Sequence, residues 1–311
     1  MDKITVAVPC HTDARLQERP SGNGLHIYFC ADDFGVSKSS CDRIAACVND
    51  GCLNKVSVLP NSELEDIKIK LKSLNGADLS VHLNLVEGRC VGNADELFLL
   101  SDADGYFKST FLGLLVSSIL HRKAFKQQAK AEIRAQIKKA IDIFPAGTPL
   151  FLDSHQHTHM IPAVFSALCE VISDDDLNVQ YLRMPIEPTI PFLRCPSVFP
   201  DCLSINLIKC LVLRLCFWFD RKKYYKLNVP ETCFFGIMFS GDMSGKKVEK
   251  LLPEFIKYAR KRNKNLEVLF HPGYISDDEN TPYFKSIKFK KFYLSPGRRR
   301  EYDAVHHMPK V

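Results

Sequence analysis

Residues 151–159, Phe-Leu-Asp-Ser-His-Gln-His-Thr-His, begin as an apolar run and end in an aspartate and three alternating histidines. The whole chain has only 10 histidines in 311 residues, so this stretch holds an unusual share of them. Imidazole is the commonest protein ligand of catalytic metals, and it titrates closest to neutral pH. We therefore interpret the stretch as a buried strand whose end carries a candidate metal site, with solvated loop histidines as the alternative.

Short apolar strands alternate with helices on both sides of this stretch. We expect strands at 25–30, 55–59, 79–83, 150–152, 179–182, 234–239 and 266–270. Helices are expected at 39–50, 64–74, 111–144, 163–172, 206–219 and 248–260, and the proline-rich residues 185–200 are expected to form an irregular loop. This alternation predicts a parallel α/β sheet, closed or nearly closed, in one (β/α) barrel domain spanning 25–311. Residues 1–24 are expected to be an N-terminal extension.

The composition is that of an ordinary soluble globular protein, with 46% apolar and 25% charged residues. The net charge of +6 arises partly from two C-terminal basic runs, 285–291 and Arg298-Arg299-Arg300. Since no aromatic stacking pattern or nucleic-acid module accompanies these runs, we interpret them as a solvated basic face and expect no nucleic-acid partner.

The 12 cysteines include no C-x-x-C pair, which argues against a zinc ribbon or a thioredoxin-like redox motif. The first apolar patch, residues 4–8, is too short for a secretory signal. Reduced thiols without a leader predict a cytoplasmic protein.

The longest apolar stretch, Leu207 to Phe219, is interrupted by Lys209 and Arg214. It is too short and too charged to span a bilayer, so we expect a buried or amphipathic helix. Its aromatic end, residues 217–219, precedes three basic residues and would suit peripheral lipid contact, but core burial is favoured.

Polar groups stand at the carboxyl ends of five predicted strands: Asp32/Asp33, His82, Asp153/His155, Arg183 and His271. In α/β barrels the catalytic residues come from separate strands at this face. Each residue also has a structural interpretation: a helix N-cap for one aspartate, a core histidine, a surface ion pair or a turn. A hydrolytic metal centre needs three protein ligands, a base for water and an acid for the leaving group. The five strand ends supply all of these.

Four motifs occur in order: Ala-Asp-Asp-Phe-Gly at 31–35, His-Leu-Asn-Leu at 82–85 with Glu87-Gly88, Leu-Asp-Ser-His-Gln-His-Thr-His at 152–159, and His-Pro-Gly at 271–273. Together they resemble the YdjC-like carbohydrate deacetylases, from Leu25 to Tyr302. The resemblance implies an irregular (β/α) barrel of the deacetylase and glycosidase kind. It also implies metal-dependent removal of N-acetyl groups from amino sugars, with Mg²⁺ most often given for the family and Zn²⁺, Co²⁺ or Ni²⁺ as alternatives.

The resemblance implies site roles at six positions of this chain. Asp33, His82 and His155 are implied as metal ligands. Asp32 is implied as the general base and His271 as the general acid, with Arg183 orienting Asp32.

Several alternatives stay open at this point. His157 or His159 could replace or support His155 as a ligand. The chain could be another metal-dependent barrel hydrolase, an amidohydrolase or a phosphoesterase, or a carbohydrate-binding relative without catalysis. The expected partner is an acetylated amino sugar, and a homodimer is left open.

Overall fold

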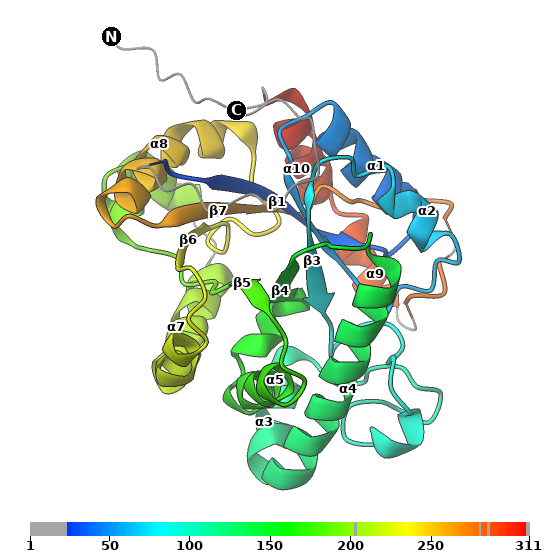
Figure 1. Ribbon diagram of the computed structural model, residues 1–311. Helices are drawn as coiled ribbons and strands as arrows, with labels where there is room; N and C mark the ends of the chain where they lie inside the picture. The colour runs from blue at the N-terminus through cyan, green and yellow to red at the C-terminus, as the bar shows by residue number, and fades with distance from the viewer. Residues whose placement is uncertain (1–23, 202–203, 280, 285–286, 309–311) are drawn as a thin grey trace.

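A single sheet of seven parallel strands organises the described part of the chain (Figure 1). The computed structural model describes residues 24–201, 204–279, 281–284 and 287–308. The strands are β1 (Ile27–Phe34), β2 (Lys55–Val58), β3 (Asp78–Leu83), β4 (Leu150–Ser154), β5 (Val179–Leu182), β6 (Thr232–Phe235) and β7 (Asn265–Phe270). Their order in space is β5-β4-β3-β2-β1-β7-β6, so β5 and β6 form the two edges. The sheet is curled but not closed, which confirms the predicted irregular (β/α) barrel.

Helices surround the sheet. They are α1 (Lys38–Asn49), α2 (Ile67–Leu71), α3 (Phe111–Leu120), α4 (Arg122–Ile143), α5 (Pro162–Asp174), α6 (Ile190–Leu193), α7 (Ser204–Lys226), α8 (Gly245–Lys261), α9 (Ile287–Tyr293) and α10 (Pro296–His307). Short 3-10 turns lie at Ala94–Glu96, His155–Met160 and Pro196–Asp201. The helix expected at 111–144 is two helices, because His121 leaves helical geometry at φ −117° and ψ 36°. The expected loop at 185–200 contains α6 and most of the last 3-10 turn.

The strands are buried on both faces, as expected for a parallel sheet covered by helices. All four residues of β2 are buried, including Lys55, whose ammonium lies 3.4 Å from the Glu267 carboxylate. The helices α1, α4 and α8 pack on β1, β3 and β7 and close one large apolar core. The polar strand ends therefore sit on a rigid support.

Helix α7 is longer than predicted, and its aromatic end is not in the core. Trp218 and Phe219 are exposed and Phe217 is half-buried, so the expectation of core burial is wrong for the first two. No helix in the described ranges is both long enough and apolar enough to cross a membrane. The predicted N-terminal extension lies outside the described residues except for Gly24.

Candidate functional site

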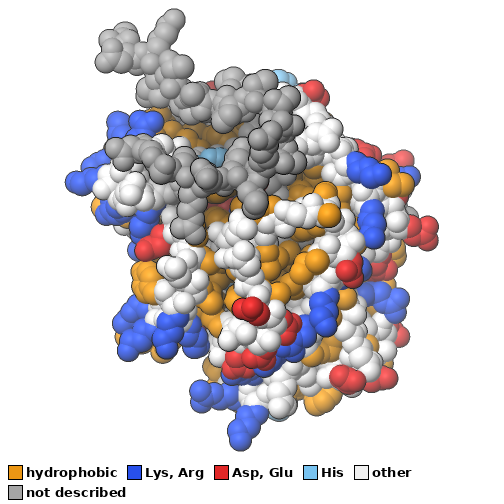
Figure 2. Space-filling model, in the orientation of Figure 1, with side chains coloured by type: hydrophobic (Ala, Val, Ile, Leu, Met, Phe, Trp, Pro, Cys, Tyr) orange, Lys and Arg blue, Asp and Glu red, His pale blue; other side chains and the backbone are white. Residues whose placement is uncertain are grey.

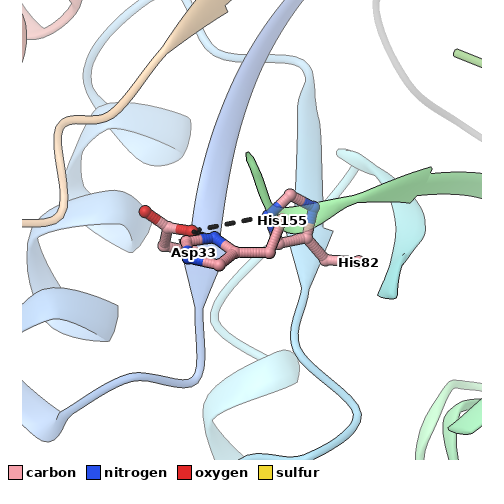
Figure 3. A group of neighbouring side chains, drawn as sticks. All are labelled: Asp33, His82 and His155. Atoms are coloured by element: carbon pink, nitrogen blue, oxygen red, sulfur yellow. Dashed lines mark hydrogen bonds and ion pairs between the residues drawn. The ribbon is translucent and has the colours of Figure 1, made fainter. Parts of the chain in front are cut away.

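The carboxyl ends of β1, β3 and β4 bring Asp33, His82 and His155 together in a buried cluster (Figure 3). Each residue offers one ligand atom, and these atoms lie within 4.8 Å of one another. Asp33 and His82 belong to β1 and β3, and His155 follows the last residue of β4. The three residues are the ones that the family resemblance implied as ligands.

A break in the register of β1 lets both Asp32 and Asp33 face this cluster. Neighbouring strand residues normally point to opposite sides of a sheet. Here the pairing of β1 with β2 is irregular between Ala31 and Phe34, and Asp33 has φ 71°. Aspartate tolerates this left-handed conformation better than most residues. As a result, the Nε2 atom of His82 lies 3.8 Å from Asp32 Oδ2 and 3.4 Å from Asp33 Oδ1.

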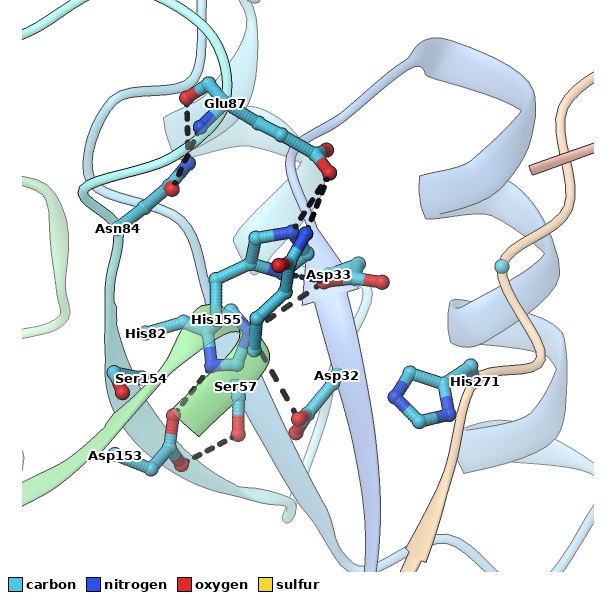
Figure 4. A network of polar contacts seen from close by, with 12 residues as sticks. Asp32, Asp33, Ser57, His82, Asn84, Glu87, Asp153, Ser154, His155 and His271 are labelled. Carbon is cyan, nitrogen blue, oxygen red and sulfur yellow. Dashed lines mark hydrogen bonds and ion pairs between the residues drawn. The ribbon is translucent and has the colours of Figure 1, made fainter. Parts of the chain in front are cut away.

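His82 makes its hydrogen bond through Nδ1 and turns Nε2 toward the carboxylates of Asp32 and Asp33. Its Nδ1 atom lies 2.5 Å from Asp153 Oδ1, while its buried Nε2 has no hydrogen-bond partner among the described residues (Figure 4). A metal-binding histidine typically donates its other ring N–H to a carboxylate in this way. Burial disfavours the imidazolium, but the charges of Asp32 and Asp153 outweigh it and raise the pKa of His82 to about 9.

His155 bridges two carboxylates. Its Nδ1 atom lies 2.8 Å from Asp33 Oδ1, and its Nε2 atom lies 3.2 Å from Glu87 Oε1. These charges outweigh burial and raise the pKa of His155 to about 10. Glu87 also accepts from Gln156 Nε2 at 3.0 Å and from the Tyr293 hydroxyl at 3.1 Å. The sequence motif contained Glu87, but it gave no sign that this carboxylate reaches the cluster.

The residues fit a divalent cation on the chemistry of their donors. One carboxylate and two imidazoles converge, and a closed structural site would need a fourth protein ligand. The Nε2 atoms of His82 and His155 are buried and form no well-directed hydrogen bond within the described ranges, but each faces a carboxylate, Asp33 at 3.4 Å and Glu87 at 3.2 Å, respectively. A cation bound between them would replace the imidazole protons. A second group, Asp32, His82 and Asp153, meets the same distance limit, but Asp153 already contacts His82 Nδ1 at 2.5 Å and Asp32 is held by Arg183.

Asp32 is fixed by Arg183, which follows β5. The guanidinium donates to both carboxylate oxygens of Asp32, at 2.8 and 2.9 Å, and it also contacts Glu267 at 2.7 and 3.0 Å. Burial favours the neutral acid, but the charges of Arg183 and His82 prevail and lower the pKa of Asp32. Asp32 is therefore an ionised carboxylate with a defined orientation beside the cluster.

His271 follows β7 and stands apart from the ligand cluster, with no contact to it drawn in Figure 4. Its Nδ1 atom lies 3.4 Å from Glu301 Oε2, and its backbone N–H donates to the same carboxylate. Glu301 belongs to α10, a helix that the sequence analysis did not predict. Its carboxylate holds the backbone of His271 and lies beside the ring.

The other two histidines of the 155–159 stretch have different surroundings from His155. The positive φ angles of Gln156 and His157, 50° and 57°, turn the chain directly after His155. His159 uses both ring nitrogens, with Ser154 Oγ at 2.5 Å and the Arg183 carbonyl at 2.8 Å. His157 packs edge-on against Phe234 at 5.9 Å between ring centroids. Neither histidine belongs to a potential metal group in the described residues.

The predicted solvated basic face does not include Arg298. Its side chain is fully buried, and it donates to Asp33 Oδ2 at 2.5 Å and to the Gly273 carbonyl at 3.1 Å. Arg299 and Arg300 are half exposed, as a solvated basic face requires. The three arginines look alike in sequence, and only the packing of α10 against the site distinguishes them.

Comparisons with known proteins found similar sequences and a similar solved structure. A sequence profile described as YdjC-like protein matches residues 26–308. The carbohydrate deacetylase of Danio rerio is 30% identical over 54% of this chain and 52% of its own length. That of Xenopus laevis is 23% identical over 82% of this chain and 83% of its own length. The chitooligosaccharide deacetylase of Salmonella typhimurium is 23% identical over 79% and 81%, respectively.

The alignments differ in how much of each relative they include. The chain spans only 52% of the Danio rerio protein and 61% of the carbohydrate deacetylase of Thermoanaerobacter pseudethanolicus. A crystal structure from Enterococcus faecalis, of a protein named for cellobiose-phosphate cleavage, superposes with a TM-score of 0.61. The superposition covers 91% of this chain and 90% of that one at 17% identity, so it supports the fold alone.

Proposed function

This chain belongs to the YdjC-like protein family, and from that premise we propose that it is a metal-dependent carbohydrate N-deacetylase. The proposed substrate is an acetylated amino sugar in an oligosaccharide or glycoconjugate. The relatives named carbohydrate deacetylase and chitooligosaccharide deacetylase support this substrate class. The observation that carries the proposal is the buried cluster of Asp33, His82 and His155 with Asp32 beside it.

In this proposal Asp33, His82 and His155 hold a divalent cation. The chemistry that such an ion supplies when bound is Lewis acidity, which polarises a carbonyl and makes water more acidic. Carboxylate and imidazole together suit Zn²⁺, Co²⁺ or Ni²⁺ better than Mg²⁺, although Mg²⁺ is the ion most often given for the family. Arg298 holds the outer oxygen of Asp33, so the carboxylate keeps one orientation.

Asp32 and His271 carry the proton transfers. The oxygen of water bonds to the acetyl carbon while its proton passes to the Asp32 carboxylate, which Arg183 keeps ionised and oriented. The amide C–N bond then breaks as His271 gives a proton to the amine nitrogen, with the Glu301 carboxylate 3.4 Å from the other ring nitrogen. The products are acetate and a free amino sugar.

The test replaces Asp32 by asparagine, which preserves the shape of the side chain and one acceptor for Arg183. We expect turnover to fall by about 10²–10⁴-fold, because the general base is lost. Metal affinity, measured by calorimetry, should stay close to that of the wild type. The control is Asp277→Asn, whose side chain is 79% exposed and should leave acetate release unchanged.

The assay measures acetate release from N-acetylglucosamine oligomers and glycolipids with each candidate metal in turn. An undiminished rate in Asp32→Asn would remove Asp32 from the role of base. Hydrolysis of a phosphoester panel without acetate release would favour another metal hydrolase. Sugar binding without turnover under every metal would instead indicate a carbohydrate-binding relative.

A further inference from the structure

Helix α7 has an apolar face on each side. Its buried row includes Cys210, Leu213, Cys216 and Tyr224, which pack toward the core. The opposite side carries six large apolar residues, which we call the α7 stripe: Leu207, Ile208, Leu211, Leu215, Trp218 and Phe219. Each exposes between 49% and 59% of its surface. Their spacing of three and four residues places them on one side of the helix.

Basic residues continue the α7 stripe at its C-terminal end. Lys222 and Lys226 are exposed and lie four and eight residues after Trp218, so they fall on the same side of the helix. Arg221 lies 4.9 Å from the centre of the Trp218 ring. The one acidic residue of α7, Asp220, is buried and pairs with Lys223 at 3.0 Å.

Helix α3 repeats the same order of residues. Leu112, Val116, Ile119 and Leu120 expose between 54% and 71% of their surface, at a spacing of three and four residues. Exposed residues His121-Arg122-Lys123 follow directly, and residues 111–123 contain no aspartate or glutamate. In Figure 1 α3 lies at the bottom of the view and α7 lies at the lower left. Figure 2 shows Lys and Arg side chains beside hydrophobic ones where α7 lies.

We propose that the α7 stripe, assisted by α3, docks this protein on the surface of a bilayer that contains anionic lipids. An amphipathic helix with apolar and aromatic residues on one side and adjoining lysines and arginines is typical of a helix that lies in the interface plane. The basic residues meet the negative surface potential while the indole of Trp218 sits at the headgroup boundary.

The charge pattern favours a lipid surface over a second copy of the chain. A two-fold contact places the same patch on both partners. In such a contact Lys222 and Lys226 would face the same helix of the second copy, which has no exposed carboxylate to pair with them. An anionic bilayer supplies the opposite charge.

The first test removes the apolar contribution. The full chain is floated with vesicles of phosphatidylcholine alone and with mixed phosphatidylcholine–phosphatidylglycerol vesicles. We expect flotation with the anionic vesicles only, and its loss in the double variant Trp218→Ser/Phe219→Ser. The matched control is Ile69→Ser/Phe98→Ser. These side chains are 68% and 61% exposed and lie outside both the α7 stripe and α3, so their replacement should not change flotation.

The second test reverses the charges. Lys222→Glu/Lys226→Glu should weaken binding to anionic vesicles by at least about tenfold, since each basic residue near such a surface contributes several-fold. Lys68→Glu/Lys72→Glu, on α2 and at its C-cap, changes the net charge equally and should leave binding unchanged. Wild-type binding should weaken as ionic strength rises. Circular dichroism confirms that all variants are folded.

Three results would overturn the proposal. One is the absence of flotation with anionic vesicles. Another is an equal loss of binding to anionic vesicles in the stripe variants and in their controls. The third is a dimer in light scattering that Trp218→Ser/Phe219→Ser dissociates, which would assign the face to a second copy. Binding to anionic vesicles that only the stripe variants lose would support it.

Discussion

Replacing Asp153 by asparagine tests whether this buried carboxylate tunes His82 as a metal ligand. Asp153 Oδ1 lies 2.5 Å from His82 Nδ1, and both side chains are almost fully buried. Asparagine can still accept the N–H of His82 through its amide oxygen, so the ring stays in place but loses the adjacent negative charge. Arg183 keeps its contacts with Asp32 and Glu267, so no buried cation is left unpaired.

The magnitude follows from the position of Asp153 behind the ligand. Removing such a partner of a metal-binding histidine typically weakens metal affinity by about 10–100-fold, or roughly 1.4–2.7 kcal/mol. At a fixed free metal concentration above both dissociation constants, the stabilisation that the ion confers on the fold falls by the same amount. We expect acetate release by Asp153→Asn to recover when the metal concentration is raised.

Calorimetric titration of metal-free protein with Zn²⁺ or Co²⁺ measures the effect directly. The matched control is Ser57→Ala, which removes the 2.6 Å hydrogen bond to the other oxygen of Asp153 without changing its charge. Its affinity should fall less than that of Asp153→Asn. An affinity of Asp153→Asn within about threefold of the wild type would refute the reasoning, because the carboxylate would then contribute nothing through His82.

Two further predictions concern stability. Arg298→Met leaves the buried Asp33 carboxylate without its cation and should cost about 3–5 kcal/mol in urea unfolding of the metal-free protein, and less with Co²⁺ bound. An equal cost in both states would show that Arg298 does not act through Asp33. Burial raises the pKa of Glu187 from 4.5 to about 7, so the folded protein binds this proton more tightly than the unfolded chain. The free energy of unfolding should therefore fall by about 3 kcal/mol as pH rises through this range. Glu187→Gln should lose this part of the pH dependence, and an unchanged slope in thermal melts would assign it to another group.

The strand ends could be predicted from the sequence because the evidence for them is local. Each strand is a short apolar run, and the polar residue that ends it is visible next to it, as with His82 after Ser80-Val81. In a parallel sheet the carboxyl ends of all strands lie on the same side, so the convergence follows from the alternation of strands and helices. The family resemblance then identified which of the polar residues to group.

The features of the site that could not be predicted from the sequence depend on contacts between residues that are distant in the chain. Arg298 and Glu301 reach the site from α10, which follows β7 and α9 in the chain. Their neighbours in sequence resemble those of a solvent-exposed helix. The distinction among His155, His157 and His159 depends on two positive φ angles that no pattern of residue types specifies. The outward face of α7 was assigned to the core because apolar periodicity alone cannot tell which of two apolar faces is covered.

The irregularity in β1 explains how two adjacent aspartates can have different roles. In a regular strand one of them would point away from the cluster, and the site would lose either the proposed ligand or the proposed base. The left-handed conformation of Asp33 brings its carboxylate to His82 and His155, whereas Asp32 is held by Arg183. The two carboxylates thus differ in their partners and not in their chemistry. A residue that resists positive φ at position 33, such as valine, would disturb the backbone that orients both.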